Sequence, residues 1–372
     1  MNKKIYFVKK MLTLFVALLS CICVNSKTLD LPLVEKTAFD TVIDGKNVSL
    51  YTISNGEITA QITNYGGYII SLFTPDKNGE YANLVKHYDN IDKYPTANCG
   101  QVGPALGRFA NRIANAQFEL DGTIYNITKN SGQHVLHGGN QGFDHIVWDV
   151  VNVKKNALVL SCILPDGTDG FPGTLTTTLT YSITKDNGLS IVYEATTDKA
   201  TVVNLSHHVY YNLNGDGQGD IMEHQLYINS DEITETDRNN IPTGKFINVQ
   251  GTAYDFKSPI AIGQRTASGG GFGQPVPEGK VRNFDNNFVL NHSDNNKVEI
   301  VATVYSPQSG RFLEVLNDKP GLQVYTGAQT AIALESQNFP DAPNHDNFPS
   351  SVLRLGETYK HTCIYRFSTK SE

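Results

Sequence analysis

The sequence feature that most constrains the fold is a repeated alternation of apolar and polar side chains. Apolar residues recur at every second position or nearly so in "GTLTTTLTYSIT", "LSIVYEATT" and "KVEIVATVYS". Because successive side chains on a strand point to opposite faces, this alternation predicts strands with one buried face. The residues expected on the buried faces are Leu175, Leu179, Tyr181, Ile183, Leu189, Ile191, Tyr193, Ala195, Val298, Ile300, Ala302 and Val304.

Asn-Gly and Asp-Gly pairs separate these runs, as tight turns between antiparallel strands would require. Many short strands with frequent turns predict an all-β fold, a large antiparallel β-sandwich or a barrel. One short helical turn is expected near residue 90, in "YDNIDKYPT", and the Gly-rich stretch 267–279 is expected to be a surface loop. No linker or repeat divides the chain, so we predict a single domain over residues 30–372.

The first 26 residues differ from the rest, and we interpret them as a signal peptide. A basic start, "MNKKIYFVKK", precedes an apolar run of 14 residues, "MLTLFVALLSCICV", and the chain then turns polar after Ser26. That run is short for a membrane span, which needs about 20 residues. A second interpretation is a lipoprotein signal, because "LLSC" resembles a cleavage box that would leave a lipid anchor on Cys21. Either interpretation predicts secretion across the inner membrane, to a periplasmic or envelope-anchored location, with no membrane span in the mature protein.

Charge and cysteine content narrow the function classes. The chain carries 37 acidic and 30 basic residues, a formal charge of -7, so a nucleic-acid partner is not expected. Two of the five cysteines lie in the leader, and the other three, Cys99, Cys162 and Cys363, have neither metal-ligand nor disulfide spacing. We expect these three to be small buried side chains.

Four stretches concentrate polar, aromatic and glycine residues more than ordinary strands do. They are "GRFANRI" (107–113), "HVLHGGNQGFDHIVWD" (134–149), "NLSHHVYYNL" (204–213) and "LESQNFPDAPNHDNFPS" (334–350). Each alone is explained by a turn-rich connection between strands. In the third, His207 and His208 point to opposite faces if the stretch is extended, so at most one of them faces a given pocket.

Together and in this order, the four stretches resemble the aldose 1-epimerases, also called galactose mutarotases. The resemblance continues through "PDGTDGFPG", "IPTGKFINVQGTAYDF", "FDNNFVL", "GLQVYTGAQ" and "LGETYKHTCIYRF", and covers nearly everything after residue 35. It implies a galactose mutarotase-like sandwich and an isomerase that interconverts the α and β anomers of aldohexoses such as glucose and galactose. The implied partner is a small aldose sugar, no metal or other cofactor is required, and we expect a monomer or weak dimer.

The resemblance also implies site residues. His208, Glu335 and His137 fall on catalytic positions, and the sugar-contacting positions are Asn111, Arg112, Tyr210, Asp255 and Gln323. Asp285 in "FDNN" either braces the site or turns the chain. Anomer exchange breaks the ring C1–O5 bond, so one group must take the C1 hydroxyl proton while another protonates the ring oxygen. A carboxylate and an imidazole suit both tasks because each can be tuned towards neutral pH.

Other functions and several departures stay open at this point. A glycoside hydrolase would need two carboxylates flanking one bond, and a sugar-binding module would bind without anomer exchange. Metal-dependent hydrolysis is disfavoured because the histidines lack an HExxH spacing. His207 replaces the usual Asn, Asn286 stands where His is common, and Ala328 replaces the Asn of "YTGN".

Overall fold

The computed structural model describes residues 29–95, 102–267, 278–293, 297–327 and 329–370. The predicted leader 1–26 with Cys21, and also Cys99, Ala328 and most of the Gly-rich stretch, lie outside these residues. Residues Leu33–Glu372 form one compact unit. Among the residues that are described, no helix has the length and apolar character that crossing a membrane requires.

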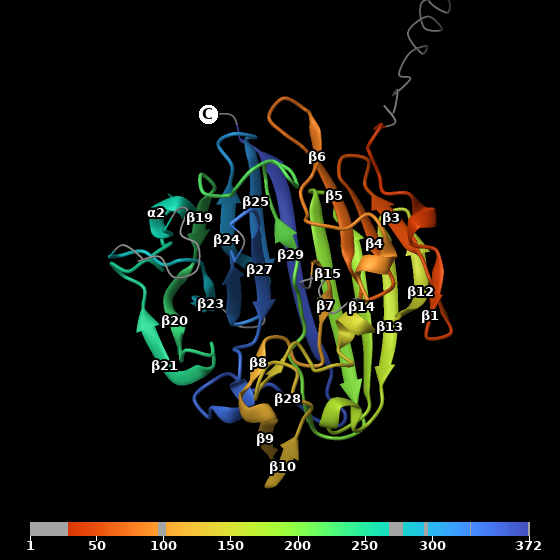
Figure 1. Cartoon of the computed structure of the whole chain (residues 1–372), viewed down its shortest axis with the longest axis vertical. Helices are drawn as coiled ribbons and strands as arrows, with labels where there is room; N and C mark the ends of the chain where they lie inside the picture. Colours follow the sequence, from red (N-terminus) through yellow and green to blue (C-terminus); the bar gives the residue numbers. More distant parts are fainter. Residues whose placement is uncertain (1–28, 96–101, 268–277, 294–296, 328, 371–372) are drawn as a thin grey trace, which may run out of the picture. The chain divides into compact units, whose positions relative to one another are not determined.

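The largest element is a nine-stranded antiparallel sheet (Figure 1). Its central strands are those with the clearest alternation: in β14 the apolar face is fully buried, while the threonines Thr176, Thr178 and Thr180 alternate with it. In spatial order the sheet contains β12 (Asp149–Lys154), β13 (Ala157–Leu164), β14 (Leu175–Ile183), β15 (Gly188–Thr197), β29 (Tyr359–Thr369), β25 (Arg311–Asn317), β24 (Glu299–Tyr305), β19 (Gln225–Ile228) and β22 (Ile260–Ala261).

One part of the predicted alternation is wrong. Ala302 and Val304 on β24 are buried, but Ile300, expected beside them, is 40% exposed. The pairing of β24 with β25 shifts register between Ile300 and Ala302, and Val301 is buried in its place. An extra residue at a bulge reverses the side that each preceding side chain faces. Such a shift leaves no clear mark in the apolar pattern.

Two further sheets cover the inner side of the nine-stranded sheet. A six-stranded sheet contains β18 (Tyr210–Tyr211), β27 (Ile332–Gln337), β26 (Gly321–Tyr325), β23 (Asp285–Leu290), β20 (Ser230–Thr236) and β21 (Pro242–Asn248). A four-stranded sheet contains β3 (Leu50–Ser54), β4 (Thr59–Thr63), β5 (Ile69–Pro75) and β6 (Tyr81–Asn83). One hydrophobic core draws residues from all three sheets, for example Leu72, Leu179 and Leu334. The prediction of a large antiparallel β-sandwich is confirmed.

Short elements connect and close the sandwich. Two-stranded ladders pair β1 (Thr41–Ile43) with β2 (Lys46–Val48), β7 (Ala105–Leu106) with β17 (Ser206–His207), β8 (Arg112–Ile113) with β11 (Val135–Leu136), β9 (Gln117–Leu120) with β10 (Thr123–Asn126), and β16 (Thr201–Val202) with β28 (Val352–Leu353). The helical turns are η1 (Lys36–Ala38), η2 (Ile91–Lys93), η3 (Ala114–Ala116), η4 (Phe143–His145), η5 (Thr168–Gly170), α2 (Ile262–Arg265) and η6 (Ala342–Asn344). Turn η2 confirms the helical turn predicted near residue 90. Cys162 and Cys363 are buried, as expected.

Candidate active site

Glu335 lies on β27, and the strand pairing shows which side chains share its face. Gln323 on β26 is directly opposite Glu335, and Asn287 on β23 is opposite Gln323. Tyr325 lies two residues beyond Gln323, opposite Asp285. Because directly paired residues point to the same side of a sheet, these side chains form one polar surface on the six-stranded sheet. Leu334 and Ser336 point to the other side, towards the nine-stranded sheet.

His208 reaches the same surface from the segment between β17 and β18. Its backbone is fixed on both sides, because its N–H donates to Pro104 and its carbonyl accepts from Gly103. Its Nε2 lies 3.4 Å from Oε1 of Glu335. The ring of Tyr210, on β18, packs against the His208 ring with 4.8 Å between centroids. The structure therefore brings the two principal predicted residues together.

His137 and Asn111 are joined through the ladder of β8 and β11. The backbone N–H of His137 donates to the Asn111 carbonyl, and the backbone N–H of Asn111 donates to Nδ1 of the His137 ring at 3.1 Å. Both residues adopt the left-handed backbone conformation, at φ 53° and φ 63°. The ring of His137 lies 5.5 Å from that of His208 between centroids. Since Nδ1 accepts a hydrogen bond, the neutral ring carries its proton on Nε2 and can only donate there.

Asp285 provides the carboxylate at the rim of the site. Its Oδ1 accepts from Nε2 of Gln323 at 2.7 Å, and its Oδ2 accepts from Nδ2 of Asn240 at 2.8 Å. The Arg112 guanidinium lies 3.7 Å from the same Oδ2. The Arg112 and Asp285 side chains are 18% and 23% exposed, whereas those of His208 and Glu335 are 8% and 2% exposed. The site thus has a buried floor, His208 and Glu335, and a charged, partly open rim, Arg112 and Asp285.

Asp255 is the predicted site residue that the structure does not bring to this group. Its carboxylate accepts from the backbone N–H groups of Gly251 and Lys257, both in its own turn. Its carbonyl accepts from Arg265. Asp285 occupies the place expected for Asp255 because β23 lies next to β26 in the sheet. The sequence does not show which strands pair. Its local pattern does not separate the two aspartates either, because Asp255 precedes a phenylalanine and Asp285 follows one.

The structure adds two residues, Tyr325 and Asn240, that the sequence analysis did not place at the site. Tyr325 packs near both His208 and Tyr210, with ring centroids 6.0 Å from each. Its position two residues after Gln323 on a strand would have predicted it. Asn240 lies in a loop before β21, and nothing in its surroundings in the sequence marks it. Asn286 pairs with Val324 and therefore points to the opposite side from Asp285.

His207 confirms the expectation that neighbouring histidines diverge. Its Nε2 lies 2.9 Å from the hydroxyl of Tyr181 and 3.3 Å from the carbonyl oxygen of Gly67, in the interior. Burial lowers its pKa to about 3. His207 is therefore a neutral interior residue.

Burial dominates the electrostatics of the floor. It raises the pKa of Glu335 well above the usual value; the Asp285 charge adds to this and Arg112 opposes it. It lowers the pKa of His208 to about 4. The pKa of His137 is lowered well below its usual value by burial, and then by His208 and Arg112. Burial thus favours a protonated Glu335 beside a neutral His208, a pair that shares one exchangeable proton.

His137, His208 and Glu335 are also close enough to be considered as metal ligands, with one candidate atom from each lying within 4.8 Å of the others. The Asn111 N–H occupies the Nδ1 lone pair of His137, and the remaining nitrogen bears hydrogen. Only two of the three side chains can then offer a lone pair, and an ion held by them would sit beside an N–H donor. The donor set therefore fits proton transfer better than metal binding.

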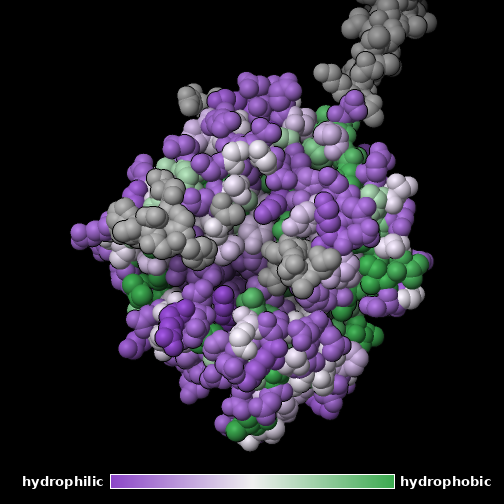
Figure 2. Space-filling model, viewed as in Figure 1, coloured by the Kyte–Doolittle hydropathy of each residue, from purple (hydrophilic) through white to green (hydrophobic). Residues whose placement is uncertain are grey.

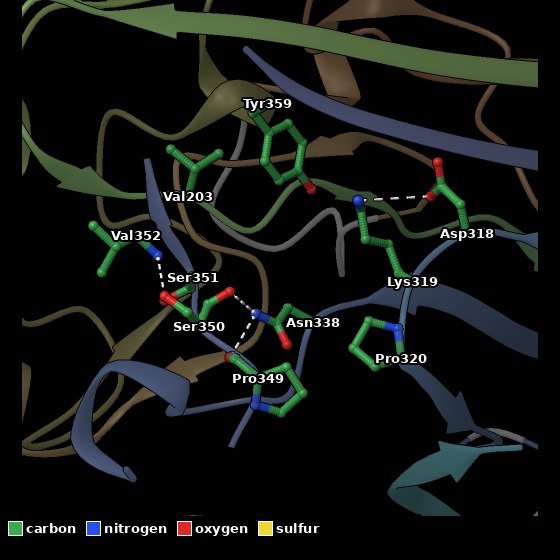
Figure 3. A pocket seen from close by; sticks show the side chains of 10 residues that line it. All are labelled: Val203, Asp318, Lys319, Pro320, Asn338, Pro349, Ser350, Ser351, Val352 and Tyr359. Carbon is green, nitrogen blue, oxygen red and sulfur yellow. Dashed lines mark hydrogen bonds and ion pairs between the residues drawn. The ribbon is translucent and has the colours of Figure 1, made fainter. Parts of the chain in front are cut away.

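A separate cavity of about 180 Å³ lies beyond the end of β27 (Figure 3). Figure 3 shows Lys319 and Asp318 paired with each other at 3.7 Å, across from Tyr359 and Asn338. The described lining contains none of the predicted site residues. Its only lysine is already paired, so we assign it no part in the chemistry.

Comparisons with known proteins agree with this geometry. A family model described as aldose 1-epimerase matches residues 49–366. Galactose mutarotase from Bos taurus is 34% identical over 346 residues, which cover 88% of this chain and 96% of that protein. Aldose 1-epimerase from Escherichia coli (strain K12) is 32% identical over 342 residues, covering 87% and 96%.

A solved structure extends the likeness to three dimensions. The crystal structure of an aldose epimerase homologue from C. elegans has a TM-score of 0.79 and 29% identity, covering 87% of this chain and all of that one. A galactose 1-epimerase from Lactobacillus acidophilus, at 23% identity and a TM-score of 0.76, shares the fold. With the family matched over most of its length, this chain belongs to the aldose 1-epimerase family.

Proposed function

We propose that this protein is a mutarotase, which interconverts the α and β anomers of aldohexoses by acid–base catalysis of ring opening. The observation that carries the proposal is the 3.4 Å approach of His208 Nε2 to Glu335 Oε1 on one buried surface. Galactose mutarotase and aldose 1-epimerase are the names of the relatives described above. Comparing rates for glucose, galactose and other aldoses in the assay below identifies the preferred sugar.

Ring opening needs one proton removed and one delivered. The base takes the proton of the C1 hydroxyl, the C1–O5 bond breaks as the C1 carbonyl forms, and the acid protonates O5. Rotation about C1–C2 and the reverse steps close the ring on the other face. Because Glu335 and His208 hold one exchangeable proton between them, one member is the acid whenever the other is the base. Closure returns the proton, so the pair is regenerated.

His137 has a different task in this scheme. Its Nδ1 is occupied by the Asn111 N–H, so giving up the Nε2 proton would leave an anionic ring. It therefore acts as a fixed donor to a sugar oxygen, which stabilises negative charge as it develops during ring opening. Arg112 and Asp285 hold the remaining hydroxyls, because a guanidinium donates and a carboxylate accepts. The rings of Tyr210 and Tyr325 supply an apolar surface for the sugar face.

Polarimetry on a freshly dissolved single anomer tests the proposal. We expect wild-type protein to accelerate the approach of α-glucose or α-galactose to equilibrium. His208→Asn should lose at least about 100-fold, as the loss of one proton-transfer group does. The matched control is His207→Asn, its neighbour on the opposite side, which should keep most of the activity per folded molecule. Equal rates for His208→Asn and wild type would refute the mechanism.

An aryl glycoside added to the same assay separates the alternatives. A mutarotase leaves the glycosidic bond intact, whereas a glycoside hydrolase releases the aryl alcohol. A sugar-binding module would bind the free sugar and leave its rotation at the uncatalysed rate. Asp285 is already held by Gln323, Asn240 and Arg112, which supports binding over proton donation for this second carboxylate.

We also propose that the protein acts outside the cytoplasm, in the periplasm or on the envelope. The basic start and apolar run of the first 26 residues support this. Mass spectrometry of the N-terminus after cell fractionation tests it. Cleavage after Ser26 would indicate a soluble protein, and a lipid on Cys21, abolished by Cys21→Ser, an anchored one. An intact leader on cytosolic protein would refute the location.

For its assembly we propose a monomer or weak dimer. Figure 2 shows hydrophilic residues over most of the face in view, with hydrophobic residues gathered at the edge where β12 and β1 lie. Val42 on β1 and Val151 and Val153 on β12 are 62%, 60% and 49% exposed there, fewer than the roughly 20–30 residues a side of a standard interface. Light scattering over a range of concentrations measures the state. A concentration-independent oligomer would contradict the proposal.

A further inference from the structure

The nine-stranded sheet sends buried polar side chains into the core beneath the catalytic floor. His361 and Tyr365 on β29, and Tyr193 on the neighbouring β15, are each 1% exposed. Buried polar groups in a sandwich core need partners, because an unpaired one is costly. Their partners lie on the two segments that carry Glu335 and His208.

On the Glu335 side, both neighbours of the glutamate are held. The hydroxyl of Tyr365 donates to the Leu334 carbonyl at 2.6 Å. The hydroxyl of Ser336 lies 2.9 Å from Nε2 of His361. The side chains of Leu334 and Ser336 point away from Glu335 on the strand. These contacts therefore hold β27 from the side opposite the site.

On the His208 side, the segment Leu205–Ser206 is held in the same way. Nδ1 of His361 lies 2.9 Å from the Leu205 carbonyl, and the Leu205 N–H donates to the Tyr359 hydroxyl at 3.1 Å. The Tyr193 hydroxyl donates to the Ser206 carbonyl at 2.5 Å. The Ser206 hydroxyl also donates directly to the Ser336 carbonyl at 2.8 Å, and among the described residues His361 is the one ring that bonds to both segments.

The chemistry of these partners fixes the orientation of His361. A carbonyl only accepts, so Nδ1 carries the proton, and Nε2 must then accept the Ser336 hydroxyl hydrogen. Burial lowers the pKa of His361 to about 3, so the ring stays neutral and both bonds persist. The ring of Tyr193 stacks on it, with 5.9 Å between centroids and planes 22° apart.

We propose that His361 is a positioning residue for epimerisation, which sets the separation of Glu335 and His208 by joining the two backbone segments that carry them. The proposal rests on the proposed function. It deepens that function because proton transfer depends steeply on the geometry of both groups, and a displacement of about 1 Å can cost on the order of 100-fold. Sugar binding depends on the rim, which His361 does not contact.

The test measures kcat and KM by polarimetry for His361→Phe and Ser336→Ala, each normalised to folded protein. His361→Phe keeps an aromatic ring for Tyr193 but removes both hydrogen bonds, and Ser336→Ala removes one. We expect kcat to fall about 10–100-fold in the first and about 3–10-fold in the second, with KM within about threefold of wild type. A residue that only stabilises the fold would lower the amount of folded protein and leave both constants unchanged.

The chain offers a matched control in Tyr211. It is fully buried, its ring lies 5.0 Å from that of Tyr365, and its hydroxyl has no hydrogen-bond partner among the described residues. Tyr211→Phe should therefore leave kcat and KM at their wild-type values, and the urea midpoint of unfolding should not fall, because the hydroxyl that is removed is buried without a partner.

Rescue and non-additivity complete the test. His361→Asn places an amide N–H near Nδ1, so it should recover part of the kcat lost in His361→Phe. The double variant Ser336→Ala/His361→Phe should lose no more than His361→Phe alone, because one bond cannot be lost twice. Wild-type kcat in His361→Phe, or purely additive losses, would overturn the proposal. Absence of mutarotation by the wild type would instead refute the proposed function.

Discussion

On the six-stranded sheet a single strand, β26, separates Glu335 of the floor from Asp285 of the rim, yet their surroundings differ. On the floor, Glu335 and His208 lie in the interior with few polar partners: Oε2 of Glu335 and Nδ1 of His208 have none among the described residues. On the rim, Asp285 is bonded to Gln323 and Asn240 and faces Arg112. Desolvation favours the uncharged forms on the floor: it raises the pKa of Glu335 and lowers that of His208 to about 4. On the rim, a guanidinium that donates and a carboxylate that accepts are suited to holding hydroxyls.

The largest expected effect comes from the floor. Glu335→Gln removes the carboxyl proton but keeps the shape, so kcat should fall at least about 100-fold while KM changes little. Measuring both constants by polarimetry checks this. A rise in KM at unchanged kcat would mean that Glu335 belongs with the binding groups, and the division between floor and rim would fail.

Next in size is the rim carboxylate. Asp285→Asn should raise KM about 10–100-fold, because hydrogen bonds to a charged acceptor are each worth about 1.5–3 kcal/mol. The matched control is Asp255→Asn, whose carboxylate bonds only within its own turn, and KM should then stay within about twofold of wild type. The opposite outcome would restore Asp255 to the site.

The third prediction concerns pH. Burial lowers the pKa of His207 and His361 to about 3 and of His208 and His224 to about 4. In the unfolded chain these rings titrate near about 6.5, so their contribution is fully present above that pH and is lost as the pH falls towards 4.

The raised pKa of Glu335 acts in the opposite direction: its contribution is present below its unfolded pKa of about 4.3 and is lost as the pH rises. Between pH 6.5 and 4.5 the histidines dominate, at about 1.4 kcal/mol per ring and pH unit. Urea unfolding at several pH values should show the decline. His208→Asn should reduce its slope, and Arg112→Lys should not.

The smallest effect is expected at Arg112. Arg112→Lys keeps the charge but loses the planar fork of donors, so KM should rise about 3–10-fold with kcat nearly unchanged. Initial rates over a range of sugar concentrations would measure it. A loss confined to kcat would place Arg112 with the proton-transfer groups instead.

The sequence predicted those parts of the molecule that depend on local pattern. Alternation marked β14 and β15, because an inner face must be apolar wherever two sheets pack. It failed at Ile300, where a bulge changes the register without changing the composition. The resemblance indicated His208, Glu335 and His137 because each lies in a short contiguous motif, which can be recognised without knowing how the strands pair.

Asp285 was harder to identify because its role comes from strand order. β23 follows β22 in the chain but pairs with β26 and β20, and this pairing places Asp285 beside Gln323. Two Asp residues adjacent to Phe, Asp255 and Asp285, look alike without that neighbour relation. His361 was invisible for a related reason, since its two partners lie 25 and 156 residues away.

The bond from the Asn111 N–H to the His137 ring makes that histidine an unusual member of the set. It behaves as an amide or an indole would, always offering hydrogen and never buffering. A sugar oxygen placed before it meets the same donor in acidic and in alkaline surroundings. The hydrogen bond that His137 offers to the sugar is thereby independent of the proton transfer between Glu335, His208 and the sugar.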